Sequence, residues 1–191
     1  MMKIFNCALG LCLAEVVTAH GPGSFTNVLN FGDSWAWLGK GELEKALKSR
    51  GVDTFTTHAI PGAPVALFAA TPKVLANKVR KSNAQAVVLS IGGNDFLEGM
   101  PKTHDQDAIL AEMLINTDRL LKPVFEEFPN VHVYHFGYEI LDWPGSAHCE
   151  TYGNNELLSM CLRGWRDAKC CNKAATDYLQ TLFVGALKTK Y

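Results

Sequence analysis

The 191-residue sequence has almost no surplus of charge, because 18 lysines and arginines are balanced by 19 aspartates and glutamates, a formal net charge of −1. It also lacks a basic stripe interleaved with aromatic residues, which is the usual footprint of a nucleic-acid surface. The small basic group of Lys78, Arg80 and Lys81 lies at the end of a predicted helix, where cations oppose the helix dipole. We therefore expect no nucleic-acid partner.

No apolar run is long enough to cross a membrane, which takes about 20 residues in a helix. The nearest case is residues 4–17, which follow Lys3 and end at the small-residue pattern Val17-Thr18-Ala19. A positive flank, a short apolar run and small residues are typical of a secretory signal. We expect residues 1–19 to be a signal peptide, and residues 20–191 to be a secreted, extracellular protein without a stable membrane anchor.

The cysteines lack the spacing of a zinc site, which needs paired ligands two to four residues apart. Cys149, Cys161, Cys170 and Cys171 remain after the expected signal peptide. In an oxidising compartment, four cysteines predict two disulfides. A bond between the adjacent Cys170 and Cys171 would be strained, so each is expected to pair with one of the other two. No metal or organic cofactor is implied.

The chain then alternates short β-type runs with helical patterns, which indicates an α/β fold with a parallel sheet. The four predicted strands are 28–31, 52–57, 86–91 and 131–136. The predicted helices are one around Leu43 to Gly51, one over 65–81 that is interrupted near Pro72, one over 110–124 that Pro123 kinks or divides, and a last one over 175–186. Length and composition favour one domain with a single core. No repeat is present, and nothing indicates an oligomeric state.

Two of these strands end at glycine and are followed by reactive polar side chains. The first continues as Phe31-Gly-Asp-Ser34, and the third as Gly92-Gly-Asn94-Asp95. Ligands bind at the carboxyl edge of parallel sheets, where both groups would emerge. Ser34 is then a candidate nucleophile and Asn94 a candidate oxyanion donor. The competing interpretations are a helix N-cap for Ser34 and a turn residue for Asn94.

The two segments, in this order and each at a strand end, resemble the SGNH (GDSL-type) ester hydrolase family over essentially the whole mature chain. The resemblance implies a three-layer, flavodoxin-like α/β fold with strand order 2-1-3-4 and a final strand beyond the end of this chain. It also implies an esterase or lipase type of activity on a small-molecule, glycan or lipid ester. The catalytic residues would be Ser34 as the nucleophile, with the N–H of Gly62 and the side chain of Asn94 in the oxyanion hole.

The family's last block, Asp-x-x-His, has no match, because no aspartate here has a histidine three residues later. That block supplies the general base, which a serine nucleophile needs. His148, with Asp142 nearby, is a possible substitute base. Two hypotheses follow besides an active enzyme: an SGNH-like binding module that lacks the base, and a hydrolase domain that is incomplete at its carboxyl end. His132 and His135, three apart on a strand, are expected to face opposite sides of the sheet.

Overall fold

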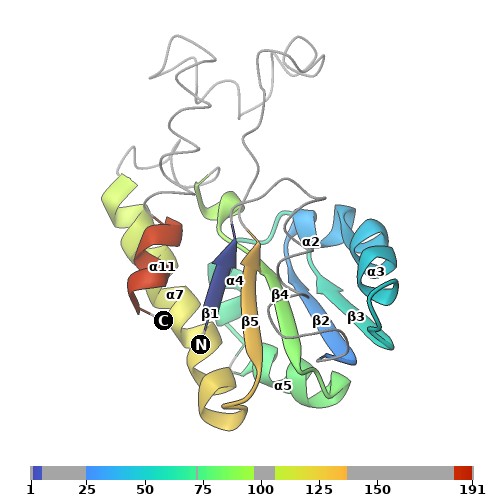
Figure 1. Cartoon of the computed structure of the whole chain (residues 1–191). Helices are drawn as coiled ribbons and strands as arrows, with labels where there is room; N and C mark the ends of the chain where they lie inside the picture. Colours follow the sequence, from blue (N-terminus) through green and yellow to red (C-terminus); the bar gives the residue numbers. More distant parts are fainter. Residues whose placement is uncertain (1, 6–24, 72, 97–105, 137–182, 191) are drawn as a thin grey trace, which may run out of the picture.

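The protein is described by a computed structural model, which covers residues 2–5, 25–71, 73–96, 106–136 and 183–190. In this part of the chain a central sheet lies between two layers of helices (Figure 1). The three-layer α/β fold expected from the alternating pattern is therefore confirmed. The cysteines at positions 149–171, the predicted disulfides, His104 and His148 lie outside the described residues.

All five strands of the sheet are parallel, in the spatial order β3-β2-β4-β5-β1. Their bounds are Met2–Phe5 for β1, Asn27–Gly32 for β2, Thr54–Ala59 for β3, Ala86–Ser90 for β4 and His132–Phe136 for β5. The register aligns Gly32 of β2 with Ala59 of β3 on one side and with Ser90 of β4 on the other. The carboxyl ends of these three strands therefore lie level with one another.

The order of β3, β2, β4 and β5 agrees with the predicted order 2-1-3-4. The strand predicted over 52–57 is β3, which begins two residues later than predicted, at Thr54, and continues to Ala59. Beyond β5, where a further strand was expected, the sheet has β1 in parallel pairing, with Met2 beside Val133 and Phe5 beside Phe136. β1 belongs to the segment that the sequence assigns to a signal peptide, and that assignment stays a prediction.

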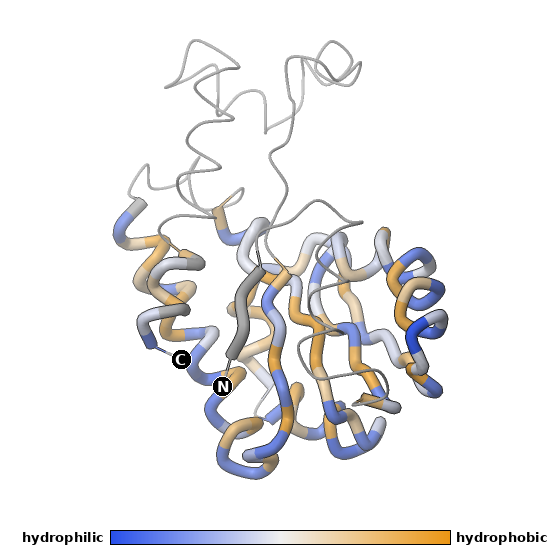
Figure 2. The backbone as a smooth tube through the Cα atoms, viewed as in Figure 1, coloured by the Kyte–Doolittle hydropathy of each residue, from blue (hydrophilic) through white to orange (hydrophobic). Residues whose placement is uncertain are grey.

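Two hydrophobic clusters show which helices cover each face of the sheet. Alternate strand residues such as Leu29, Val87 and Val133 join a large cluster with residues of α4 (Val65–Ala69), α5 (Val74–Ser82) and α7 (Gln106–Glu127). The intervening residues, such as Val28 and Val88, join a smaller cluster with α3 (Lys40–Lys48). Since side chains alternate along a strand, the sheet is covered on both faces, which agrees with the run of buried residues along β4. In Figure 2 hydrophobic residues are frequent along the central strands, whereas the helices around them carry hydrophobic and hydrophilic residues in turn.

The two predicted helical segments that contain a proline differ in continuity. The segment predicted over 65–81 is interrupted, since α4 ends at Ala69 and α5 begins at Val74 after Lys73, which has a left-handed φ of 58°. The helix α7, in contrast, continues through Pro123 to Glu127 and is not divided. The last described helix is α11 (Val184–Lys190), in which Leu187 is fully buried. The earlier part of that predicted helix, 175–182, lies outside the described residues.

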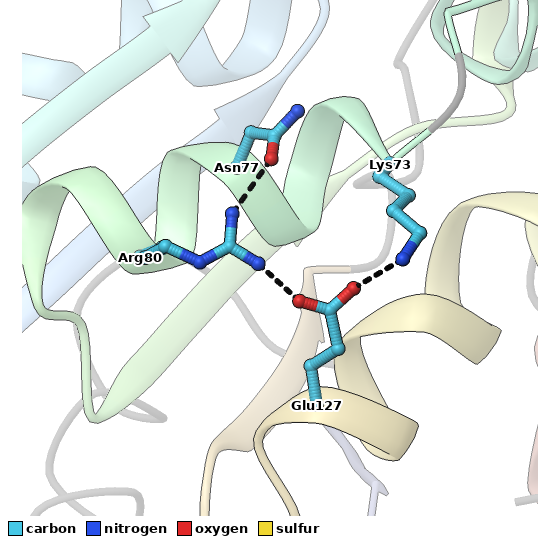
Figure 3. Close-up of polar contacts among 4 residues, drawn as sticks. All are labelled: Lys73, Asn77, Arg80 and Glu127. Carbon is cyan, nitrogen blue, oxygen red and sulfur yellow. Dashed lines mark hydrogen bonds and ion pairs between the residues drawn. The ribbon is translucent and has the colours of Figure 1, made fainter.

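A surface cluster of ion pairs connects α5 to the end of α7 (Figure 3). Glu127 accepts a hydrogen bond of 2.8 Å from the Lys73 ammonium and another from the Arg80 guanidinium, which also donates to Asn77 at 2.8 Å. Arg80 therefore has a structural partner within the fold. Within the described ranges, no helix is both long and apolar enough to span a membrane.

Candidate active site

Ser34 lies directly above the carboxyl end of β2, as the first residue of the short helix α2 (Ser34–Leu38). The turn that places it depends on Gly32, whose φ is +154°. A Cβ atom at this position would lie 1.9 Å from the carbonyl oxygen of Ser90, so only glycine allows β2 and β4 to approach this closely. The N–H of Asp33 then donates to that carbonyl oxygen at 3.0 Å. Ser34 is thereby fixed at the sheet edge, where it is partly exposed.

The N-cap of α2 is Asp33 and not Ser34. The carboxylate of Asp33, which is fully buried, accepts a hydrogen bond of 3.0 Å from the N–H of Trp35. The alternative interpretation of Ser34 as a capping serine is therefore wrong. Its hydroxyl makes no hydrogen bond with any described residue and takes no part in holding the helix.

Gly62 lies in a tight turn that follows β3. The N–H of Ala63 donates to the carbonyl oxygen of Ile60 at 3.1 Å, which closes a four-residue turn with Pro61 and Gly62 at its centre. Proline followed by a residue of φ near +80° is the pattern of a type II turn, and Gly62 has a φ of +78°. At the start of this turn, the N–H of Ile60 donates to the carbonyl oxygen of Gly32 at 2.9 Å. The turn is therefore held beside the residues that precede Ser34.

Asn94 connects the two other segments. Its Nδ2 atom donates to Oδ2 of Asp33 at 3.3 Å and to the carbonyl oxygen of Ala63 at 3.2 Å. One contact reaches the neighbour of Ser34 in the chain, and the other reaches the neighbour of Gly62. The fold thus brings together the three segments that carry the predicted site residues, although they are up to 61 positions apart in sequence.

Asp95 forms a second connection from the same strand end. Its two carboxylate oxygens accept from the N–H of Val65 at 3.0 and 2.8 Å, at the start of α4. Burial raises the pKa of this carboxyl to about 6, and the negative charges of Glu112 and Asp33 add to the rise, although hydrogen bonds from the N–H groups of Val65 and of Asp95 itself oppose it. The pKa of Asp95 therefore lies much nearer to neutral pH than that of an ordinary aspartate.

No histidine among the described residues contacts Ser34. His132 stacks against Tyr134 on the α3 side of the sheet, whereas His135 packs edge-on against Phe183 on the other side, which confirms that the two face apart. His135 is buried, its Nε2 lies 3.3 Å from the carbonyl oxygen of Ile91, and burial lowers its pKa to about 4. The pKa of His58 is lowered by burial and by the positive charge of Lys78. These histidines are not placed to act as the base.

The described part of the chain contains no group of three or more histidine, cysteine or acidic side chains that could hold a metal ion. A cavity of about 40 Å³ lies between α2, α3 and the sheet, and its walls are mostly apolar. Trp35 and Phe136 contribute to these walls, together with the hydroxyl-bearing Ser90 and the amide-bearing Asn30. None of Ser34, Gly62 and Asn94 lines it, so this cavity is separate from the polar cluster at the strand ends.

Asp33 and Asp95 are the residues of this cluster that the sequence analysis missed. Each lies inside a motif that was already identified, next to Ser34 and Asn94 respectively. A signal was available for Asp33, since aspartate directly before a helix is a preferred N-cap. No local signal predicts the role of Asp95, because its partner Val65 is 30 positions away.

Comparisons with known proteins give similarity at the level of the fold. No protein-family model matches this chain, and no curated protein matches it. Among solved structures, the chain is similar to a family 3 carbohydrate esterase of Clostridium thermocellum, with 19% identity and a TM-score of 0.45, over 71% of this chain and 70% of that one.

Two further structures show similar values. A catalytic mutant of an acetylxylan esterase from Geobacillus stearothermophilus has 18% identity and a TM-score of 0.41, over 74% of each chain. An alpha/beta hydrolase enzyme from the metagenome of Lake Arreo, Spain, has 16% identity and a TM-score of 0.39, over 75% of each chain. At these values the similarity carries no conclusion about the activity of this chain, which has to be argued from its own residues.

Proposed function

We propose that this protein is a serine ester hydrolase that acts through an acyl-enzyme. The Ser34 hydroxyl attacks the acyl carbon of an ester, and the oxyanion that forms is held by the N–H groups of Ser34 and Gly62 and by the side chain of Asn94. The observation that carries this proposal is the pair of hydrogen bonds from Asn94 to Asp33 and Ala63, because it gathers the three segments at one sheet edge.

The backbone donors support the proposal. Ser34 is the first residue of α2, so its N–H has no acceptor within the helix. The N–H of Gly62 lies at the centre of its turn and has no acceptor among the described residues. Backbone N–H groups without acceptors, fixed before the reaction begins, are the donors that stabilise a developing oxyanion most effectively. The Asn94 amide would exchange its longer contact, 3.3 Å to Asp33, for the oxyanion.

The proton of the Ser34 hydroxyl has to pass to a base as the new C–O bond forms, and then to the leaving alcohol. The described histidines are not placed for this transfer, as their hydrogen-bond and ring partners show. His148 as the substitute base stays a prediction from the sequence. We further infer a small-molecule, glycan or lipid ester as the substrate and an extracellular location, both on the sequence pattern alone.

Labelling with a fluorophosphonate probe tests Ser34 directly, and hydrolysis of p-nitrophenyl acetate tests turnover. Ser34→Ala should abolish labelling and lower kcat/KM by about 10³-fold or more, as loss of a serine nucleophile does elsewhere. Ser49→Ala is the matched control, because Ser49 is an exposed serine at a helix end whose hydroxyl donates only to Ala46. A folded wild-type protein that neither labels nor turns over ester would refute the hydrolase proposal.

A binding module without turnover is the second candidate, and the absence of any described histidine beside Ser34 favours it. This candidate predicts that the wild-type protein binds an ester ligand without cleaving it. Binding would raise the midpoint of thermal unfolding, since a ligand that binds only the folded state stabilises it. A thermal shift with p-nitrophenyl acetate, in wild type and Ser34→Ala alike and without nitrophenol release, would support the binding module over the enzyme.

A further inference from the structure

The strand end of β4 holds the Gly62 turn through two adjacent residues. Asn94 donates to the carbonyl oxygen of Ala63 at 3.2 Å, and Asp95 accepts from the N–H of Val65 at 2.8 and 3.0 Å. The turn is also anchored at its beginning, where Ile60 donates to the carbonyl oxygen of Gly32 at 2.9 Å. The segment from Ile60 to Val65 is therefore fixed at both ends, and Gly62 lies between the two anchors.

At the second anchor, Asp95 is the side chain that accepts from the start of α4. The N-cap residue of α4 is Pro64, which makes no side-chain hydrogen bond to the helix. The N–H of Val65, the first in the helix, has no acceptor within α4, and capping side chains usually satisfy such a group from the adjacent position. Here the acceptor comes from a residue 30 positions later in the chain. The position of α4, and with it the end of the turn, is thus set by the end of β4.

Burial of the Asp95 carboxylate at this place is also unfavourable in free energy. It forms no ion pair with any described residue, and the charged groups that act on it, Glu112 and Asp33, are both negative. A buried carboxylate without a cation costs free energy, so its presence needs a compensating gain. Among the described residues, the contact that reaches this side chain from another segment, and that could supply the gain, is the pair of hydrogen bonds from the N–H of Val65.

We propose that Asp95 is a positioning residue of the oxyanion site: its hydrogen bonds to Val65 hold the Ile60–Val65 segment so that the N–H of Gly62 stays aimed at the reacting carbonyl. This inference rests on the proposed hydrolase function, in which Gly62 is a donor. Asp95 touches neither the substrate nor the nucleophile. It acts through the turn, and Asn94 acts on the same turn from the neighbouring position while also serving as a donor itself.

The variants Asp95→Ala and Asp95→Asn test the proposal. The alanine variant removes both acceptors, whereas the asparagine variant keeps one oxygen that can accept from Val65. Glu112→Gln is the matched control. It removes a negative charge near Asp95, and the Glu112 side chain makes no hydrogen bond to the described residues of the turn. Circular dichroism and thermal unfolding identify any variant that fails to fold, in which case the asparagine variant carries the test.

Kinetics with p-nitrophenyl acetate should show a loss in kcat. A displaced oxyanion donor weakens binding of the transition state but not of the bound substrate. Asp95→Ala should therefore lower kcat by about 10- to 100-fold, which is less than deletion of a donor causes, and should change KM less than about threefold. Asp95→Asn should fall between Asp95→Ala and wild type. Glu112→Gln should remain within about twofold of wild type.

Hydrogen exchange gives a readout that needs no turnover. In Asp95→Ala the hydrogen-bonded amides within residues 60–66, those of Ile60, Ala63 and above all Val65, should exchange at least about tenfold faster than in wild type, while those of β4 and α7 keep their rates. An active wild type whose Asp95→Ala variant keeps its kcat, or loses it without faster exchange at 60–66, would overturn the proposal. An inactive and unlabelled wild type would instead refute the hydrolase function. In that case unchanged exchange at 60–66 would also refute the anchoring role of Asp95, and faster exchange would support it.

Discussion

Asp95 lies at the carboxyl end of the sheet, and Glu127 lies at the end of α7. Their carboxylates differ in burial, in their hydrogen-bond donors and in the charge of their neighbours. Asp95 is largely buried, takes its hydrogen bonds from a backbone N–H and has negative neighbours, and its pKa rises to about 6. Glu127 lies at the surface between Lys73 and Arg80, and the hydrogen bond from Lys73 is the main reason that its pKa falls (Figure 3).

Acidic side chains therefore have two roles in this fold, one in surface ion pairs and one in hydrogen bonds to backbone N–H groups. The Glu127 cluster connects two helices with partners that solvent and salt weaken, so it contributes little to stability. The acids at the strand ends, in contrast, replace missing backbone partners in places that water does not reach freely. They tie together loops that follow three strands, and for Asp95 the cost varies with pH. The ion pairs of Glu127 at the surface therefore do not indicate where the buried polar contacts of this fold lie.

The largest expected effect concerns pH, because two buried groups oppose each other. The folded pKa of His135, about 4, lies below its ordinary 6.5, so its neutral form stabilises the fold above pH 6.5 and that stabilisation, about 3 kcal/mol, is lost as pH falls to 4. The folded pKa of Asp95, about 6, lies above its ordinary 3.8, so its ionised form costs about 3 kcal/mol above pH 6, and the cost disappears as pH falls to 3.8.

In the wild type these two contributions should nearly cancel between pH 4 and 6.5. Urea unfolding across this range should show Asp95→Asn losing about 3 kcal/mol on acidification, since the shift of His135 is then no longer offset by that of Asp95. His135→Leu should show the reverse, a gain on acidification from Asp95. Parallel pH curves for the wild type and both variants would mean that neither group is buried as the structure places it.

The next effect is that of Asp33→Ala, which should lower the free energy of unfolding by about 2 kcal/mol. The substitution removes the N-cap of α2 and leaves the Asn94 amide without one of its acceptors. Asp33→Asn, which keeps an acceptor for the N–H of Trp35, should lose less. Asp53→Ala is the control, because Asp53 is exposed at the opposite end of the sheet. Equal losses for Asp33→Ala and Asp53→Ala would remove the distinction between strand-end and surface acids.

The smallest effect is expected for Glu127→Gln at the surface. This substitution should lower the midpoint of thermal unfolding by less than Asp33→Ala does, because its partners Lys73 and Arg80 are more than half exposed. The difference from wild type should disappear in 1 M salt, where charges at the surface are screened within about 3 Å. A loss that matches Asp33→Ala and persists in high salt would show that the Glu127 cluster is structural in the same sense as the strand-end acids.

Much of the fold follows from local pattern. The continuously apolar run before Gly92 predicted a central strand, and β4 is covered on both faces. The glycines that end the first and third predicted strands, Gly32 and Gly92, both have positive φ angles that favour glycine. The continuation of α7 through Pro123 was not resolved by pattern, because packing against α4, α5 and the sheet decides whether a helix tolerates the missing hydrogen bond.

The site was predictable only in part, because its residues act across the sheet. Ser34, Gly62 and Asn94 each follow a strand, so the parallel topology alone predicted that they share one edge. The sequence offered an N-cap role only as the alternative interpretation of Ser34, whereas its neighbour Asp33 caps the helix, since both residue types favour an N-cap and only the backbone geometry distinguishes them. The role of Asp95 depends on α4, whose distance from β4 no local pattern encodes.

By itself, the sequence determined which residues could do chemistry and at which edge of the sheet they would emerge. It did so because hydrophobic periodicity sets the strands, and glycine sets the points where they stop. The tertiary structure decided which of these residues touch. Contacts such as Asn94 to Ala63 and Asp95 to Val65 join loops that follow different strands, and their distances depend on how close β2, β3 and β4 can pack. That packing is a property of the whole sheet with its two helical layers, which no single segment contains.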